Sequence, residues 1–173
     1  MEERRNVIKN DWLFLAATLV GISFCSPTYA LTPDHSAVTL SFVQLASNTF
    51  IYNPRTLTWK AVSANGQVVR TGHGSGGRGY CPDIHRACHT PTGTFRIMSK
   101  GGPGCRSSRF PVGKGGAPMP YCMFFSKYYA IHGSPEVPNY NASHGCIRVH
   151  PRDAHWLSQD FISIGTKVVV KPY

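Results

Sequence analysis

Short apolar stretches separated by glycine and proline follow one another along the chain after residue 30. Many of them alternate apolar with polar positions or are rich in β-branched and aromatic residues, a pattern typical of β-strands. Asn65 and Gly66 suit a hairpin turn between two of these stretches, because both residue types tolerate a positive φ. The predicted strands cover residues 37–45, 48–52, 57–62, 67–70, 94–98, 123–125, 128–131 and 167–171.

Residues 151–161 carry the one convincing helical pattern. Pro151 suits a first helical turn, and Asp153 favours the positive end of the helix dipole. One face of this helix would be apolar, with Ala154, Trp156, Leu157 and Phe161. The chain therefore predicts a mainly β fold, a sandwich or mixed sheets with a few short helices.

Residues 1–30 have the pattern of a secretory signal. Basic residues at its start precede the uncharged apolar run 12–24, and small residues end at Ala30, where a signal peptidase would cut. The run is about 13 residues long, short of the ~20 needed to span a bilayer, although an uncleaved anchor is the alternative. We expect residues 31–173 to form a single domain with no membrane span after cleavage.

The net charge of +10 belongs to the expected mature domain, because residues 1–30 contain equal numbers of basic and acidic residues. A basic exported protein is drawn to polyanions such as acidic wall polymers. The basic residues are scattered and match no nucleic-acid motif, so nucleic acid is not an expected partner. The few acidic residues after residue 30 form no convincing pair, which disfavours catalysis by two carboxylates.

Export also changes how the six cysteines are interpreted. Cys25 would leave with the signal, and five thiols in an oxidising compartment leave one without an intramolecular partner. We favour disulfides Cys81–Cys88 and Cys105–Cys122, because each closes a local loop among glycines and prolines. The sequence alone leaves the other two pairings open.

The segment Ser143-His144-Gly145-Cys146-Ile147-Arg148, with His132 and Gly133 upstream, combines the groups that thiol acyl transfer needs. A cysteine attacks a carbonyl as its thiolate, so a nearby imidazole must accept its proton. A glycine before the nucleophile leaves room for backbone N–H groups to face the developing oxyanion. The alternative is a buried structural thiol beside an ordinary histidine.

Two other motifs compete for a function. Cys81, His85, Cys88 and His89 could ligate zinc, but their spacing fits no common zinc module and the compartment favours a disulfide. The glycine-rich segment 72–79 lacks the Gly-Lys-Ser/Thr ending of a phosphate loop, so a loop beside a substrate groove is the better interpretation. We also expect loops at 101–104 and 113–116.

The motif around Cys146 resembles the signature of L,D-transpeptidases with a YkuD-type catalytic domain: His-Gly, then Ser/Thr-His-Gly-Cys, a hydrophobic residue and Asn or Arg. Similar flanking segments are Thr90 to Phe95, Met119 to Phe125, the helix after Asp153, and Gly165 to Val168. The resemblance extends over about residues 47–171. Only ten residues separate His132 from Ser143, fewer than is common in the family.

The resemblance implies roles for the site residues. Cys146 would be the nucleophile and His132 its base, held through its other ring nitrogen by the Gly133 carbonyl. Backbone N–H groups near His144, Gly145 and Cys146 would form the oxyanion hole, and His144 would shape the site. Ser143 would stabilise the turn, Arg148 would hold the loop or a substrate carboxylate, and Tyr121 would line the groove.

The implied substrate is a peptidoglycan tetrapeptide stem, from which the enzyme would release D-alanine before passing the acyl group to an amine. That amine would belong to a second stem, giving a 3–3 crosslink, to an outer-membrane lipoprotein lysine, or to a D-amino acid. The chemistry requires no metal or cofactor, and the signal and disulfides suggest the periplasm of a Gram-negative cell. The alternatives are an L,D-carboxypeptidase or thiol hydrolase, and a non-catalytic cell-wall-binding protein.

Overall fold

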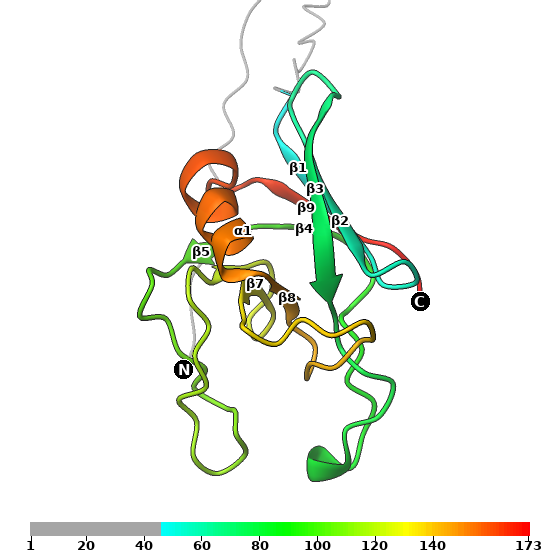
Figure 1. Cartoon of the computed structure of the whole chain (residues 1–173), viewed down its shortest axis with the longest axis vertical. Coiled ribbons are helices and arrows are strands. Elements are labelled where there is room, and N and C mark those ends of the chain that lie inside the picture. The colour runs from blue at the N-terminus through cyan, green and yellow to red at the C-terminus, as the bar shows by residue number, and fades with distance from the viewer. Residues whose placement is uncertain (1–45) are drawn as a thin grey trace, which may run out of the picture. The chain divides into compact units, whose positions relative to one another are not determined.

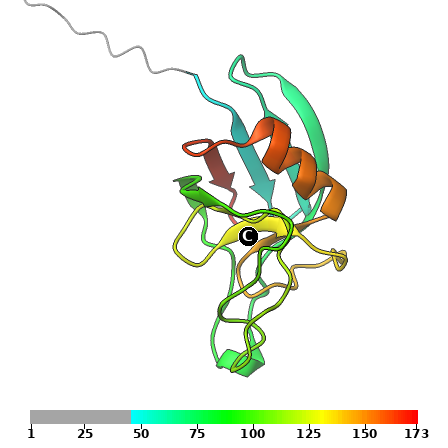
Figure 2. The same cartoon turned by 90° about the vertical axis from the view of Figure 1, so that its left-hand side faces the viewer.

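The computed structural model describes residues 46–173, which form one curled mixed β-sheet with a short helix against it (Figures 1 and 2). The mainly β prediction is confirmed. The proposed signal at 1–30 and the predicted strand at 37–45 lie outside the described residues. Within residues 46–173, no helix has the length and apolar character needed to cross a membrane.

Nine strands lie in the order β4-β9-β1-β2-β3-β8-β7-β6-β5. The pairs β1–β9 and β7–β8 are parallel, and the other neighbours are antiparallel. The strands are β1 (Thr49–Asn53), β2 (Thr58–Val62), β3 (Val68–Ser75), β4 (Gly93–Arg96), β5 (Ser99–Lys100), β6 (Met123–Phe124), β7 (Ala130–Gly133), β8 (Ile147–Val149) and β9 (Lys167–Val170).

Strand β3 joins the two halves of the sheet. Its first part pairs with β2 across the predicted hairpin, where Gly66 has φ +86°. Its last two residues, Gly74 and Ser75, pair with β8. The prediction of a loop beginning at Gly72 is wrong: Gly72 lies in the strand, and an added Cβ there would be 2.4 Å from the Trp59 ring. The missing side chain leaves room for the buried Trp59 ring against the strand, and no turn is formed here.

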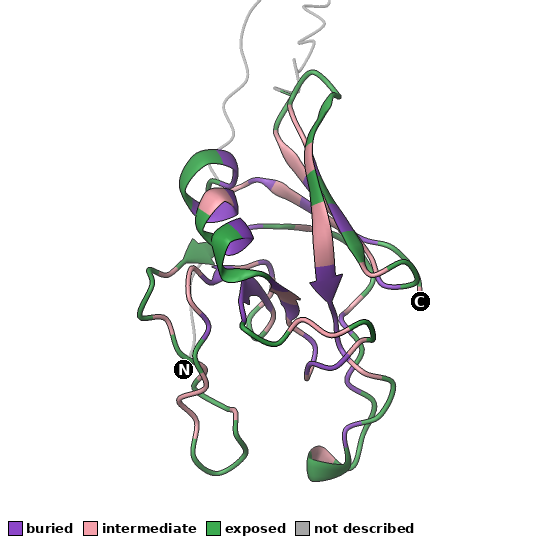
Figure 3. Cartoon of the chain, viewed as in Figure 1, coloured by how far each residue is buried: buried purple, intermediate pink, exposed green. Residues whose placement is uncertain are grey.

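The predicted helix at 151–161 is confirmed in extent. The α-helix α1 (Pro151–Trp156) continues into the π-helical turn η2 (Leu157–Phe161). Ala154, Leu157 and Phe161 are buried in the main core (Figure 3), together with residues of β1, β2, β7, β8 and β9. Asp153 in the first turn also pairs with Arg70 of β3 at 3.0 Å, which ties the helix to the sheet.

Two disulfide-closed loops extend from one end of the sheet (Figures 1 and 2). Their bonds are Cys81–Cys88, which encloses the 3₁₀ turn η1 (Pro82–Ile84), and Cys105–Cys122. This is the pairing favoured from the sequence. Cys146 is the cysteine of residues 46–173 that remains outside a disulfide. The oxidised sulfurs of Cys81 and Cys88 offer no thiolate to zinc, which removes the proposed zinc cluster.

Candidate active site

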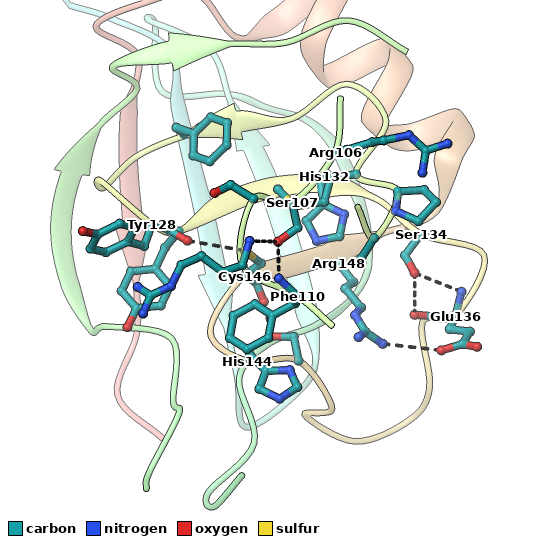
Figure 4. A pocket seen from close by; sticks show the side chains of 18 of the residues that line it. Arg106, Ser107, Phe110, Tyr128, His132, Ser134, Glu136, His144, Cys146 and Arg148 are labelled. Carbon is teal, nitrogen blue, oxygen red and sulfur yellow. Dashed lines mark hydrogen bonds and ion pairs between the residues drawn. The ribbon is translucent and has the colours of Figure 1, made fainter. Parts of the chain in front are cut away.

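Strands β7 and β8 bring the two central residues of the motif to one face of the sheet. The parallel register pairs Ile131 with Ile147 and His132 with Arg148. Side chains alternate along each strand, so the isoleucines point into the core, where both are fully buried. His132, Arg148 and Cys146, the residue directly before β8, therefore share the opposite face. They line one pocket of about 370 Å³ (Figure 4).

His132 is a buried neutral base. Its Nδ1–H donates to the Gly133 carbonyl at 2.9 Å, the contact expected from the sequence, and this leaves the Nε2 lone pair available. Only 6% of the residue is exposed. Burial lowers the pKa of His132 to about 4, and the nearby Arg148 charge acts in the same direction. The imidazole is thus unprotonated at neutral pH and able to accept a proton.

Cys146 is half-buried at the floor of the pocket. Burial raises its pKa, while a backbone hydrogen bond from Ala130 and the charge of Arg148 lower it. Its Sγ lies 3.9 Å from the Tyr128 carbonyl oxygen, an acceptor for the thiol proton. The resting pair is therefore a thiol and a neutral imidazole, so the proton would move to His132 as the sulfur attacks a substrate.

Ser143 stabilises the turn Ser143–Cys146 through two hydrogen bonds. Its Oγ–H donates to the Cys146 carbonyl at 2.5 Å, and the same oxygen accepts the Gly145 N–H at 3.0 Å. This agrees with the turn-stabilising role expected for Ser143. Of the backbone N–H groups expected in the oxyanion hole, that of Gly145 is used within the turn, and those of His144 and Cys146 remain candidates.

Gly145 has a steric role that the sequence did not reveal. Its φ is +117°, and an added Cβ would lie 2.3 Å from Cε1 of Tyr129. The space beside this glycine is thus filled by an aromatic ring and is not open to substrate.

His144 links the catalytic turn to both disulfide loops. Its Nε2 lies 2.8 and 2.9 Å from the two carboxylate oxygens of Asp83, and its ring stacks on Phe110 with centroids 4.2 Å apart. The hydrogen bond to His144 lowers the pKa of Asp83. This confines His144 to the pocket wall. The sequence analysis missed Asp83, because only the fold brings it to the motif.

Arg78, just before the Cys81–Cys88 loop, and Cys88 at its end both contact the backbone of the turn. The Arg78 guanidinium donates two hydrogen bonds to the Ala142 carbonyl, at 2.6 and 3.1 Å. The backbone N–H of Arg78 donates to the Ser143 carbonyl at 3.0 Å. Cys88 Sγ lies 3.7 Å from the same Ser143 oxygen. The glycine-rich segment that leads into this loop is therefore a support for the turn. None of residues 72–79 lines the pocket, contrary to the predicted groove loop.

Of the two residues expected to contact the substrate, Arg148 lines the pocket and Tyr121 does not. Tyr121 does not line the pocket: it packs against the main core and meets His155 edge-on, with centroids 4.9 Å apart. The expected groove position of Tyr121 is thus not part of this pocket, and its backbone has a left-handed φ of +56°. Arg148 does line the pocket, and its guanidinium lies 3.7 Å from the Glu136 carboxylate.

Comparison with known proteins gives one family. Residues 43–170 match the family model described as the L,D-transpeptidase catalytic domain, YkuD. No curated protein matches the sequence significantly.

Solved structures agree with that family. An L,D-transpeptidase from Xylanimonas cellulosilytica is 28% identical with a TM-score of 0.62, over 72% of this chain and 60% of that one. The L,D-transpeptidase LdtMt1 in complex with imipenem is 25% identical with a TM-score of 0.60, over 72% and 58%. One from Mycobacterium smegmatis shares the fold at 23% identity and a TM-score of 0.60, over 73% and 59%. The chain thus spans about 60% of the length of the first of these.

Proposed function

Because the chain belongs to the YkuD family of L,D-transpeptidase catalytic domains, we propose that it is an exported peptidoglycan L,D-transpeptidase with Cys146 as nucleophile and His132 as base. The observation that carries the proposal is the parallel β7–β8 pair, which directs both side chains into one pocket. The pKa of Cys146 is raised and the pKa of His132 is lowered, so the resting thiol keeps its proton. This favours transfer of the proton to His132 during the attack and not before it.

In the first half-reaction, the Cys146 sulfur attacks the carbonyl carbon of the third stem residue as its proton passes to Nε2 of His132. The N–H groups of His144 and Cys146 face the developing oxyanion. The tetrahedral intermediate collapses, the C–N bond to the terminal D-alanine breaks, and His132 returns the proton to the leaving amine. The product is a thioester on Cys146.

In the second half-reaction, an amine attacks the thioester and loses a proton to His132, the C–S bond breaks, and His132 returns that proton to the Cys146 sulfur, which restores the resting thiol. We propose a second peptide stem as the amine donor, which makes a 3–3 crosslink. Cys146 and Tyr129 both line the pocket and are both partly exposed, which supports access of a peptide amine to the thioester.

The proposed compartment is the periplasm. Two disulfides within residues 81–122 are a feature of proteins in oxidising compartments. Residues 1–30 supply the pattern of an export signal. Expression of the full chain with a C-terminal tag, followed by cell fractionation and mass spectrometry of the N-terminus, tests both statements. A cytoplasmic, uncleaved product would contradict them.

The activity is tested with residues 31–173 and a synthetic tetrapeptide stem, with products resolved by mass spectrometry. Release of D-alanine together with stem dimers supports transfer, and tripeptide alone identifies a hydrolase on the same scaffold. Dimers containing a lysine peptide or a D-amino acid, added in competition, would reveal another acceptor. Imipenem should add its mass to Cys146, and Cys146→Ala should lose both adduct and products. Unchanged products with Cys146→Ala would refute the assignment.

A further inference from the structure

The pocket around Cys146 is lined by an excess of positive charge. Arg86 comes from one disulfide loop, Arg106 and Arg109 from the other, and Lys127 from the β6–β7 connection. These four, here called the basic rim, join Arg148 at the pocket wall. Glu136 is the one acidic residue that lines the same space.

The basic rim has no acidic partners in the part of the chain that the structure describes. Arg148 has Glu136 within 4 Å, whereas none of the four rim cations forms an ion pair with a carboxylate there. Positive side chains that converge on a concave, partly apolar site repel one another, and they raise the local concentration of anions. The rim therefore has unused capacity for an anionic ligand.

Two of the rim cations lie against the ring of Tyr128, another residue of the pocket lining. The Arg109 guanidinium carbon lies 4.6 Å from the Tyr128 ring centroid, and the Lys127 Nζ lies 5.3 Å from it. The carbonyl of the same tyrosine contacts the Cys146 sulfur. Stacking on an aromatic ring restrains a guanidinium, which lowers the entropy lost when it binds a ligand.

Arg106 and Arg148 lie on another side of the pocket. In Figure 4, Tyr128 lies to the left of Cys146, Arg148 lies to its right, and Arg106 lies farther away at the upper right. Arg106 is held in place by a hydrogen bond from its guanidinium to the Gly116 carbonyl at 2.6 Å. It directly follows Cys105, whose disulfide to Cys122 anchors the base of its loop. Positive charge from both disulfide loops, the β6–β7 connection and β8 thus lines the pocket that contains Cys146.

We propose that the basic rim binds carboxylates of the donor stem, so that the enzyme selects stems with a free carboxylate on each side of the scissile bond. This inference rests on the proposed function. On the leaving side the carboxylate belongs to the terminal D-alanine, and on the other side to a diamino acid that bears a second carboxylate. Arg109 and Lys127 contact one of these groups, and Arg106 with Arg148 contacts the other.

The test compares four tetrapeptide stems: the free diacid, each single carboxamide, and the dicarboxamide. An amide keeps the shape of a carboxylate but removes its charge. Loss of one charge-assisted hydrogen bond lowers kcat/KM by about 10- to 100-fold. We expect wild-type protein to prefer the diacid to each monoamide by that factor, with a preference that shrinks as sodium chloride screens the charges. Equal kcat/KM for all four stems would overturn the inference without any variant.

Variants then assign the two contacts. Arg109→Ala should lose the preference for one carboxylate, and Arg106→Ala should lose the preference for the other, each with the remaining preference intact. Arg55→Ala is the matched control, since it removes the same charge from an exposed turn outside the pocket. Selectivity that stays at the wild-type value in both rim variants would refute their role.

Binding separates this inference from the proposed function. The Cys146→Ala protein cannot react, so calorimetry with the same four stems measures recognition alone. Diacid binding that weakens on amidation supports the rim even if the wild-type enzyme turns over no stem, a result that would refute only the activity. Turnover of stems with no carboxylate preference would refute only the rim.

Discussion

Gly145→Ala tests whether the Tyr129 ring fixes the catalytic turn. The substitution places a Cβ 2.3 Å from Cε1 and 2.7 Å from Cδ1 of Tyr129, closer than real Cβ contacts. The ring packs against the main core, so it cannot simply rotate into solvent. The backbone at φ +117° is also unfavourable for alanine. The added methyl group therefore destabilises the protein in two ways, through the clash with Tyr129 and through the unfavourable φ.

The two costs can be estimated and separated. A non-glycine residue held at such a φ costs about 1–3 kcal/mol, and overpacking costs about 1–3 kcal/mol more. Gly66→Ala is the control, because Gly66 has φ +86° with no atom within 4 Å of an added Cβ. It should lose only the first amount in urea unfolding. The excess loss in Gly145→Ala measures the clash.

Activity gives a second measurement. Displacement of the Cys146 sulfur by about 1 Å can cost roughly 100-fold in rate, so imipenem acylation of Gly145→Ala should slow by about that factor, while Gly66→Ala acylates normally. Adding Tyr129→Ala to Gly145→Ala should recover part of the rate by removing the obstructing ring. If Gly145→Ala is no less stable than Gly66→Ala and reacts at the wild-type rate, the steric account is refuted.

Three further predictions concern the turn, its base and its support. Ser143→Ala should lose about 1–3 kcal/mol of stability with the hydrogen bond to the Cys146 carbonyl, and Ser143→Thr should retain it; equal urea midpoints would argue against the bond. His132 binds a proton more readily unfolded, near its usual pKa of about 6.5, than folded, where it is about 4. The difference adds about 3 kcal/mol to the free energy of unfolding above pH 6.5, and this amount is lost as the pH falls towards 4. His132→Gln should flatten this part of the curve of stability against pH, and an unchanged slope would contradict the burial argument. Replacing Cys81 and Cys88 by serine should cost about 2–3 kcal/mol in thermal unfolding and slow imipenem acylation, whereas an unchanged acylation rate would show that the loop does not support the turn.

Prediction of the strands from sequence succeeded where alternation was long enough to read. Strands β1, β2 and β9 lie within a residue or two of their predicted bounds. Strands β5 and β8 were missed, because two or three residues are too few to establish a period, whereas the equally short β6 was found because it belongs to the apolar run Met123-Phe124-Phe125. Gly72 was predicted to lie in a loop because glycine is common in turns. Only the packing of the Trp59 ring against this glycine shows that it allows the ring to approach the strand backbone closely.

The sequence alone determined the chemistry of the motif around Cys146, because its thiol, hydroxyl and turn glycine lie within four consecutive residues. Covalent spacing is enough to bring Ser143 to the Cys146 carbonyl, and an adjacent carbonyl is enough to orient His132. Contacts between residues far apart in the chain depend on the fold instead. Asp83 reaches His144 across 61 positions, and the Arg109 guanidinium stacks on Tyr128. Such contacts depend on strand order and on two disulfide-closed loops meeting at one end of the sheet, so no local pattern in the sequence encodes them.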